Sequence, residues 1–309
     1  WDRDKPMRPP LHATMFEKVW HWAYLAFCAA VFLFLILPIV VIVPLSFNAE
    51  PYFTFSREML SLDPAGYSLR WYERLLTFGM TAPDAARDAN WWADAWANSQ
   101  WLHAARNSFL IGIVSTVIAT SLGTLAALGL SRPEMPFRRA VTALLISPMI
   151  VPMIISATGL FFFYSKAGLA HTFLGIVLAH AMLGIPFVII TVTATLSGFD
   201  RTLLNAAAGL GAPPITAFRR VVLPLILPGI VSGALFAFIT SFDEVVVVLF
   251  IASYDQQTIP LQMWNGIREQ ISPAILAAAT ILIAFSIALL TTIELLRRRT
   301  EHLRGLRPN

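Results

Sequence analysis

The chain has 309 residues, of which 57% are hydrophobic and only 13% are charged. Soluble domains carry roughly 25% charged residues, so this composition excludes an ordinary cytosolic enzyme, whose surface needs more charge. The net charge of +4 is modest, and the single cysteine, Cys28, cannot form a disulfide within the chain. The distribution of the apolar residues therefore decides the class of protein.

Six apolar segments are long enough to cross a bilayer core of about 30 Å as helices. In chain order they are residues 20–47, 107–130, 140–164, 173–196, 224–251 and 273–296. Helices are expected because a backbone in lipid must satisfy its own hydrogen bonds, and because the apolar runs are continuous rather than alternating. The sequence predicts an all-α membrane protein with six transmembrane helices in one membrane domain, residues 20–296.

Two features of these spans concern their packing. Small residues recur every four positions on one face of the second span, which predicts close contact with another helix; they are Ser115, Ala119, Gly123 and Ala127. Prolines interrupt several spans and are expected to kink them; they are Pro38, Pro44, Pro148, Pro152, Pro186, Pro224 and Pro228. The kinks either fit the helices into a bundle or shape a path that opens and closes.

Lysine and arginine mark the cytoplasmic side of a membrane protein. Fifteen of the 22 lie in the N-terminal segment 1–19, in the loops after the second and fourth spans, or in the basic tail 297–309. Both termini are therefore expected in the cytoplasm. Five of the other seven lie in the long segment 48–106, which is predicted to form an outer cap and contains a short amphipathic helix over residues 67–76.

Patterns that carry enzyme chemistry are missing from the sequence. A phosphate-binding loop would end in Gly-Lys-Ser/Thr, yet Lys5, Lys18 and Lys166 all follow a residue other than glycine. The six histidines show no metal-binding spacing. We therefore expect neither an enzyme nor a metal site, and nothing indicates a nucleic-acid partner.

The most informative segment is residues 200–223, between the fourth and fifth spans. It contains the small residues 206–209, then Gly211, then Pro213-Pro214. The small residues predict a short helix that a partner can approach closely, Gly211 permits a turn with positive φ, and the prolines enforce a bend. An alternative is a helix lying on the inner leaflet, with Arg219 and Arg220 on phospholipid.

This segment resembles the coupling motif of the permease subunits of binding-protein-dependent ABC importers. That motif is Glu-Ala-Ala, three residues, Gly, nine residues and Ile-x-Leu-Pro. The residues here at the same spacing are Asn205, Ala206, Ala207, Gly211, Val221, Val222, Leu223 and Pro224. Asn205 replaces the glutamate, which keeps a hydrogen-bonding side chain but removes its charge.

The resemblance implies a type I importer permease in a bacterial inner membrane, in contact with lipid, with the cap 48–106 in the periplasm. It also implies a second permease, expected to be a different chain, two ATPase subunits that bind ATP and Mg²⁺, and a periplasmic binding protein. This chain would hold no cofactor of its own. A short helix over about residues 202–218 would couple it to the ATPase through Asn205, Ala206, Ala207, Gly211 and Pro224.

A finer resemblance is to the spermidine/putrescine class of these permeases. The residues that carry it are 37–48, 67–76, 241–250 and 258–273. It implies that the solute is a polyamine or a related organic cation. Alternatives are the same architecture serving an opine, an amino-acid-like, neutral or anionic solute and, from another class, a stand-alone secondary transporter.

Acidic and aromatic residues near the end of the fifth span are candidates for the solute path. Asp243 and Glu244 are predicted to lie inside that span, where carboxylates are costly unless they face water, a cation or a partner. A bond to the partner permease is the alternative role.

Three aromatic residues and one histidine complete the candidate path. Phe242, Tyr254 and Trp264 are candidate aromatic faces for an ammonium group, or else interfacial anchors. His180 in the fourth span is placed at a similar depth, in the path or as a packing residue.

Overall fold

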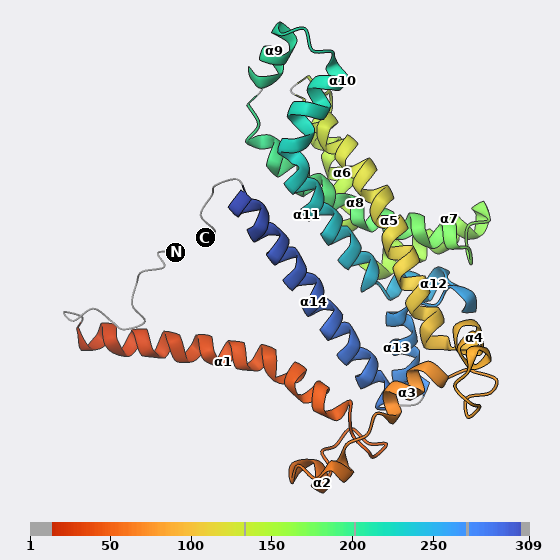
Figure 1. Cartoon of the computed structure of the whole chain (residues 1–309). Coiled ribbons are helices and arrows are strands. Elements are labelled where there is room, and N and C mark those ends of the chain that lie inside the picture. Colours follow the sequence, from red (N-terminus) through yellow and green to blue (C-terminus); the bar gives the residue numbers. More distant parts are fainter. Residues whose placement is uncertain (1–13, 133, 201, 270–271, 304–309) are drawn as a thin grey trace. The chain divides into compact units, whose positions relative to one another are not determined.

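The computed structural model describes residues 14–132, 134–200, 202–269 and 272–303 (Figure 1). Within these ranges the regular structure is helical, and the only paired extended backbone is a bridge between Asn48 and Tyr67. The helices fall into two compact units, one from the described parts of 1–75 and 270–309 and the other from 76–269. The predicted terminal segments 1–19 and 297–309 lie partly outside the described residues.

The first unit contains two long helices that contact each other, α1 (Met15–Leu45) and α14 (Ala274–Leu303). α1 begins in a capping box, in which the Glu17 N–H donates to Thr14 Oγ1 at 3.3 Å and the Thr14 N–H donates to Glu17 Oε2 at 2.7 Å. None of the most apolar stretch of α1 is buried within the chain. This stretch therefore suits a lipid or protein environment.

Short elements connect α1 to the second unit. They are α2 (Arg57–Leu60), η1 (Pro64–Gly66) and α3 (Arg70–Thr77), which matches the predicted amphipathic helix. The fully buried Asn48 organises this stretch by donating from Nδ2 to the carbonyl oxygens of Tyr52 and Thr54, both at 2.9 Å. The Trp71 indole N–H donates to the Asn48 carbonyl at 2.7 Å, so α3 is tied to the chain just after α1.

The second unit is built on three helices that pack together, α5 (Gln100–Leu130), α8 (Phe173–Ser197) and α11 (Leu223–Phe242) (Figure 1). The small residues predicted to form a seam on α5 are all buried. At Gly123 a Cβ atom would lie 2.7 Å from Val188 Cβ of α8. The predicted close helix packing is confirmed, because the absence of a side chain lets the two backbones approach.

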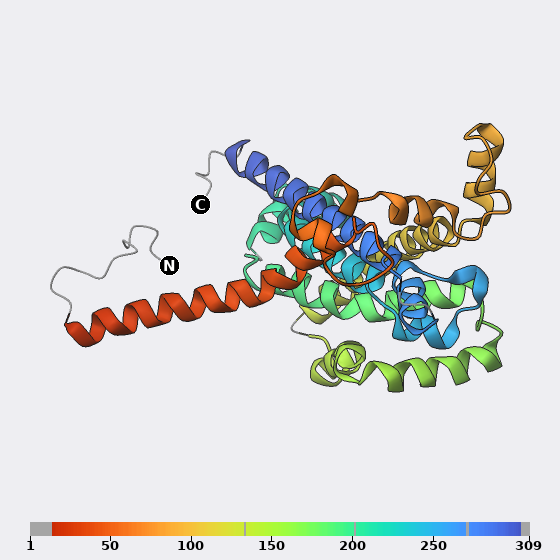
Figure 2. The same cartoon turned by 90° about the horizontal axis from the view of Figure 1, so that it is seen from below.

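The third predicted span divides into two helices at Pro152, one of the prolines expected to kink it. Residues 140–164 form two helices, α6 (Arg138–Ile150) and α7 (Met153–Ala167), which are bent by 102° relative to each other. Figure 2 shows α6 nearly end-on and α7 nearly side-on. Pro152 explains the break, because it has no N–H to donate and it favours extended backbone at Val151, whose ψ is 134°.

The fifth predicted span, 224–251, is wrong as one helix. α11 ends at Phe242, and a second helix, α12, covers Val246–Ile251. The break consists of Asp243, Glu244 and Val245. Glu244 Oε1 accepts a hydrogen bond from the Val247 N–H at 2.8 Å, which caps the new helix and stabilises the interruption.

The described helices account for the predicted spans only in part. Four stretches are long and apolar enough to cross a membrane: α1, α5, α8 and the continuous helical stretch Pro214–Phe242. The bent pair α6–α7 makes a fifth if it is one broken span, and the apolar part of α14, Ala274–Ala288, is shorter. A multi-pass membrane protein follows from these lengths.

Candidate functional site

The predicted coupling segment forms two short helices rather than one. α9 (Thr202–Gly209) carries Asn205, Ala206 and Ala207, and α10 (Pro214–Ala217) follows after a turn. Both lie beyond one end of α8 and α11 (Figure 1). The expected single helix over 202–218 is therefore corrected to a helix, a turn and a second helix.

Gly211 provides the backbone conformation that this turn requires. The Ala212 N–H donates to the Ala207 carbonyl at 3.0 Å, and the Gly211 N–H donates to the Ala208 carbonyl at 2.9 Å. These are the two bonds of a Schellman helix end, which needs a left-handed residue at the position of Gly211. Its φ is +76°, and an added Cβ would meet no atom within 4 Å. The motif glycine is therefore needed for its backbone conformation and not for space within this chain.

The start of α9 is stabilised by Asp200. The Thr202 N–H donates to Asp200 Oδ1 at 2.9 Å. The hydrogen bonds from the Thr202 side chain and backbone lower the pKa of Asp200, so its carboxylate stays charged at this helix start.

Pro224, the last residue of the motif, lies in the first turn of α11. The preceding η2 (Phe218–Val222) is a wider, π-type turn in which the Leu223 N–H donates to the Phe218 carbonyl. α10, η2 and α11 thus form one continuous helix. The wider turn of η2 accommodates Pro224, which has no N–H to donate.

The surface of this segment is apolar and exposed. Leu210 is 88% exposed and Ile215 is 73% exposed. Beneath them, a cavity of about 490 Å³ separates the segment from the ends of α5 and α8, with Leu128, Arg132 and Phe199 among its lining residues. Large exposed apolar side chains that gather in one short segment are typical of a protein-docking surface.

The two predicted path acids have different surroundings. Asp243 ends α11 and its side chain is exposed. Glu244 is only 7% exposed, and one of its carboxylate oxygens is engaged by the Val247 N–H. The acids therefore lie at a helix break instead of inside a helix, and Asp243 is the one left accessible.

The predicted aromatic residues are distributed over the same end of the second unit. Phe242 stacks on Phe238, with ring centroids 5.4 Å apart, and meets Phe109 edge-on at 5.2 Å. Tyr254 in η3 (Tyr254–Gln256) is 66% exposed, and Trp264 in α13 (Ile259–Glu269) is 44% exposed. Among the described residues, no hydrogen bond or ring contact joins either of these two to Asp243.

Residues that sequence reasoning missed hold this end together. Asn107 Nδ2 of α5 donates to the carbonyls of Asp255 and Gln257, at 2.8 and 2.9 Å, and Ser108 Oγ accepts from the Ile259 N–H at 2.8 Å. These contacts join positions about 150 apart in the sequence. No local pattern signals them, although two adjacent polar residues at the start of the apolar stretch of α5 are a hint.

His180 lies in the core of the second unit. It is 1% exposed, and its Nδ1 is 2.8 Å from Ser241 Oγ. Ser241 Oγ is in turn 3.0 Å from Ser115 Oγ. The predicted path residue His180 is thus hydrogen-bonded within the α5–α8–α11 bundle, and its partner Ser241 lies two residues before Asp243.

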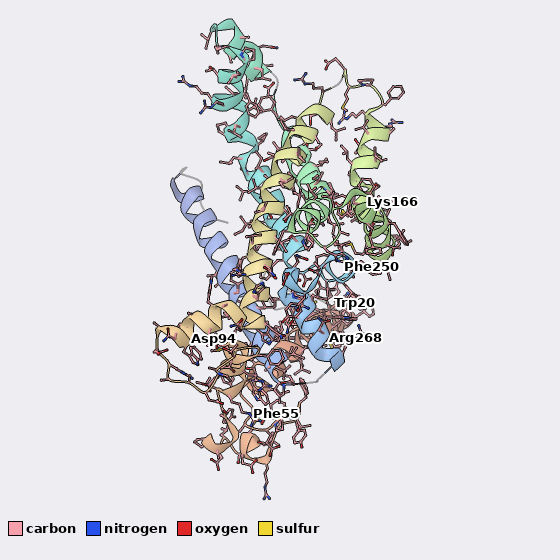
Figure 3. The ribbon with its side chains drawn as sticks, turned by 90° about the vertical axis from the view of Figure 1, so that its right-hand side faces the viewer. Trp20, Phe55, Asp94, Lys166, Phe250 and Arg268 are labelled. Atoms are coloured by element: carbon pink, nitrogen blue, oxygen red, sulfur yellow. The ribbon has the colours of Figure 1, made fainter. Side chains whose placement is uncertain are left out.

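A second cleft of about 550 Å³ lies between α7, α12 and α13. Aromatic and aliphatic side chains line it together with Arg268, and Phe250 and Arg268 are labelled in Figure 3. None of the predicted path residues lines it. Within the described ranges, no three His, Cys, Asp or Glu side chains gather as a metal site requires.

Known proteins resemble this chain over most of its length. The family described as "Binding-protein-dependent transport system inner membrane component" matches residues 119–302. The spermidine/putrescine transport system permease protein PotC of Haemophilus influenzae is 32% identical over 277 residues, which cover 90% of this chain and 97% of that protein. The putrescine transport system permease protein PotI of Escherichia coli (strain K12) is 31% identical over 265 residues, 82% of each chain.

A solved structure of a bacterial ABC transporter involved in the import of the acidic polysaccharide alginate has a similar fold, with a TM-score of 0.64. The match covers 92% of this chain and 98% of that chain at 16% sequence identity, so it supports the fold alone. The family match covers more than half of the chain, and the first relative spans nearly all of it. This chain therefore belongs to the family of binding-protein-dependent transport system inner membrane components.

Proposed function

We propose that this chain is a permease subunit of an ATP-driven importer that moves a polyamine or a related organic cation. It works beside a second permease of different sequence, two ATPase subunits and a periplasmic binding protein, with both of its termini in the cytoplasm. The exposed carboxylate of Asp243 at the helix break carries the proposal. The polyamine relatives named above support the same solute class.

The electrostatics of the break favour a cation. The end of a helix carries partial negative charge on its last carbonyls, and Asp243 adds a full charge at the end of α11. Glu244 instead accepts a hydrogen bond from the Val247 N–H at the start of α12. A cationic amine is therefore attracted to Asp243, and the aromatic rings of Phe242, Tyr254 and Trp264 add cation–π attraction of about 0.5–2 kcal/mol each where they face it.

The coupling role rests on the exposed tip of residues 202–218. Leu210 and Ile215 offer apolar surface, and the chain contains no phosphate-binding loop of its own. A groove on an ATPase subunit would bury both side chains. Asn205 keeps a hydrogen-bonding group at the start of the motif, so contact there does not depend on an ion pair.

The same residues bear on the two alternative functions. An importer for a neutral or anionic solute requires Asp243 to be covered by the second permease, and the fold does not decide this, because the alginate importer shares it. A stand-alone secondary transporter leaves Leu210 and Ile215 without a partner. His180 is buried beside Ser241, so its contact with any solute requires α8 and α11 to separate.

Uptake by the complete importer in proteoliposomes tests the proposal. We expect ATP-dependent uptake of labelled spermidine or putrescine, which unlabelled amines inhibit and glutamate does not. Asp243→Asn should lower amine uptake at least tenfold while ATP hydrolysis stimulated by the loaded binding protein changes less. Equal loss of both activities would assign Asp243 a structural role, and uptake of an anion in place of amines would overturn the solute class.

A further inference from the structure

A chain of buried polar side chains joins the three central helices just before the break. Its members are His180 of α8, Ser241 of α11 and Ser115 of α5, which are 1%, 4% and 1% exposed. His180 Nδ1 lies 2.8 Å from Ser241 Oγ, and Ser241 Oγ lies 3.0 Å from Ser115 Oγ. Buried polar side chains in an apolar bundle are stable when they hydrogen-bond to one another. Here each of the three helices contributes one such side chain.

The direction of these hydrogen bonds follows from proton counting. Ser115 Oγ lies 2.6 Å from the Ile111 carbonyl oxygen and therefore donates its single proton there. Ser241 must then donate to Ser115, which leaves Ser241 Oγ to accept from His180. This assigns the proton to Nδ1 of His180, with the lone pair on Nε2, an atom that is buried without a hydrogen-bond partner among the described residues.

Close backbone packing surrounds this chain of bonds. A Cβ at Gly184 of α8 would lie 2.9 Å from Ala237 Cβ of α11, and one at Gly112 of α5 would lie 3.1 Å from the Phe238 ring. Tight packing against α8 and α5 thus fixes the last turns of α11 on two sides, and hydrogen bonds fix them at Ser241. Asp243 follows two residues later, so its position depends on where Ser241 is held.

We propose that His180 is a positioning residue for transport, which acts through Ser241 to fix the end of α11 and thereby to place Asp243 at the break. It does this from within the bundle, without touching the solute. The transport part of this inference rests on the proposed function, whereas the structural part stands on the contacts alone.

Two substitutions at position 180 distinguish the loss of the hydrogen bond to Ser241 from the mere replacement of histidine by another polar side chain. The amide nitrogen of asparagine reaches the place of Nδ1, so His180→Asn retains the donor to Ser241. Glutamine places its amide near Nε2, so His180→Gln loses that donor while remaining polar. Ser241→Ala removes the acceptor and should match the glutamine variant.

Amide hydrogen exchange in the assembled importer measures the position of the break without any solute. We expect exchange over residues 239–247 to become about tenfold faster in His180→Gln and Ser241→Ala, and to stay near wild type in His180→Asn. Exchange over the distant residues 202–217 serves as the control. Equal rates in the Asn and Gln variants, or equal acceleration at the control segment, would overturn the positioning role.

Amine uptake then tests the functional part. His180→Gln should lower uptake in the wild-type background and cause no further loss in an Asp243→Asn background, because both changes remove the same placed carboxylate. Additive losses would show that His180 does not act through Asp243. If wild type takes up no amine while the exchange pattern holds, the proposed solute fails and the hydrogen-bonded placement of the α11 end remains.

Discussion

Asp243 and Glu244 are adjacent, yet their surroundings give them different tasks. Glu244 is buried and accepts a hydrogen bond from the first turn of α12, so its carboxyl group stabilises the chain itself. Asp243 is exposed at the end of α11 and makes no hydrogen bond through its carboxylate within the described residues. Of these two adjacent acids, Glu244 therefore stabilises the helix break, and Asp243 is left exposed at it.

Gly211 is a second residue whose role depends on its backbone. Its φ of +76° costs a β-branched residue roughly 1–2 kcal/mol, whereas asparagine tolerates that region. We expect Gly211→Val to leave membrane insertion intact and to reduce uptake per ATP hydrolysed, with Gly211→Asn close to wild type. Since an added Cβ meets no atom of this chain, equal damage by Asn and Val would indicate a steric clash with the ATPase instead of backbone strain.

Asp94 lies in the segment 48–106 that is predicted to form a cap, and its charge organises a loop (Figure 3). It accepts hydrogen bonds from Asn98 Nδ2 at 2.6 Å and from the N–H groups of Ala82 and Thr81 at 3.0 and 3.1 Å. The bonds from Asn98 and from the Ala82 backbone lower the pKa of Asp94 to about 2, below its ordinary value of 3.8.

Because the folded pKa is the lower one, the stabilisation by Asp94 is complete above about pH 4 and is lost as the pH falls toward 2. We expect the Thr81 and Ala82 amides to remain protected from hydrogen exchange at pH 4, after correction for intrinsic rates. Asp94→Ala should abolish that protection at neutral pH, and Asp84→Ala, at an exposed loop position, should not. Loss of protection already at pH 4 in wild type would contradict the assignment.

At the scale of elements, the seam between α5 and α8 depends on small residues, above all Gly123. At Gly123 a Cβ would approach Val188 Cβ to 2.7 Å, whereas at Gly129 on the same helix it would meet nothing within 4 Å. Gly123→Ala should therefore destabilise the bundle by about 1–3 kcal/mol through overpacking. Gly129→Ala should be neutral or stabilising, because alanine favours helices by about 1 kcal/mol. Thermal unfolding in detergent compares the two, and equal shifts would refute the seam.

The elements differ in how well the sequence predicts them. α1, α5 and α8 follow from apolar length, because a helix in lipid is the only local way to satisfy a long apolar backbone. The break at Pro152 is predicted as a proline kink, whereas the break at residues 243–245 escapes hydropathy, which records composition and not chain direction. Pro152 and Glu244 do carry local signals, a missing donor and a capping carboxylate, that identify both breaks once helix ends are considered.

The residues of the candidate site likewise differ in how well the sequence predicts them. The turn at Gly211 is predictable because its cause is local, a left-handed helix end followed by two prolines. The bond between His180 and Ser241 is not, because it joins positions 61 apart and depends on how α8 packs against α11. Single-sequence patterns therefore locate the turn of the proposed coupling segment and the two acids, and tertiary packing decides which acid remains accessible.

At the scale of the whole molecule, the exposed apolar surface has to be covered by lipid or by partners. The apolar side chains of α1 suit lipid or a second permease, but Leu210 lies in a segment flanked by Arg219 and Arg220 that is expected in the cytoplasm. A leucine that is 88% exposed contributes almost nothing to the stability of this chain. Its apolar surface is accounted for if the ATPase buries it.

Leu210→Glu is therefore expected to separate assembly from folding. The chain should insert and unfold as wild type does, while the ATPase subunit is lost on co-purification, because burying a leucine contributes about 1.5–3 kcal/mol and an unpaired carboxylate in its place is unfavourable. Leu60→Glu is the matched control, since Leu60 is 73% exposed in α2. Retention of the ATPase by Leu210→Glu, or its loss in both variants, would rule out the tip of residues 202–218 as the docking surface.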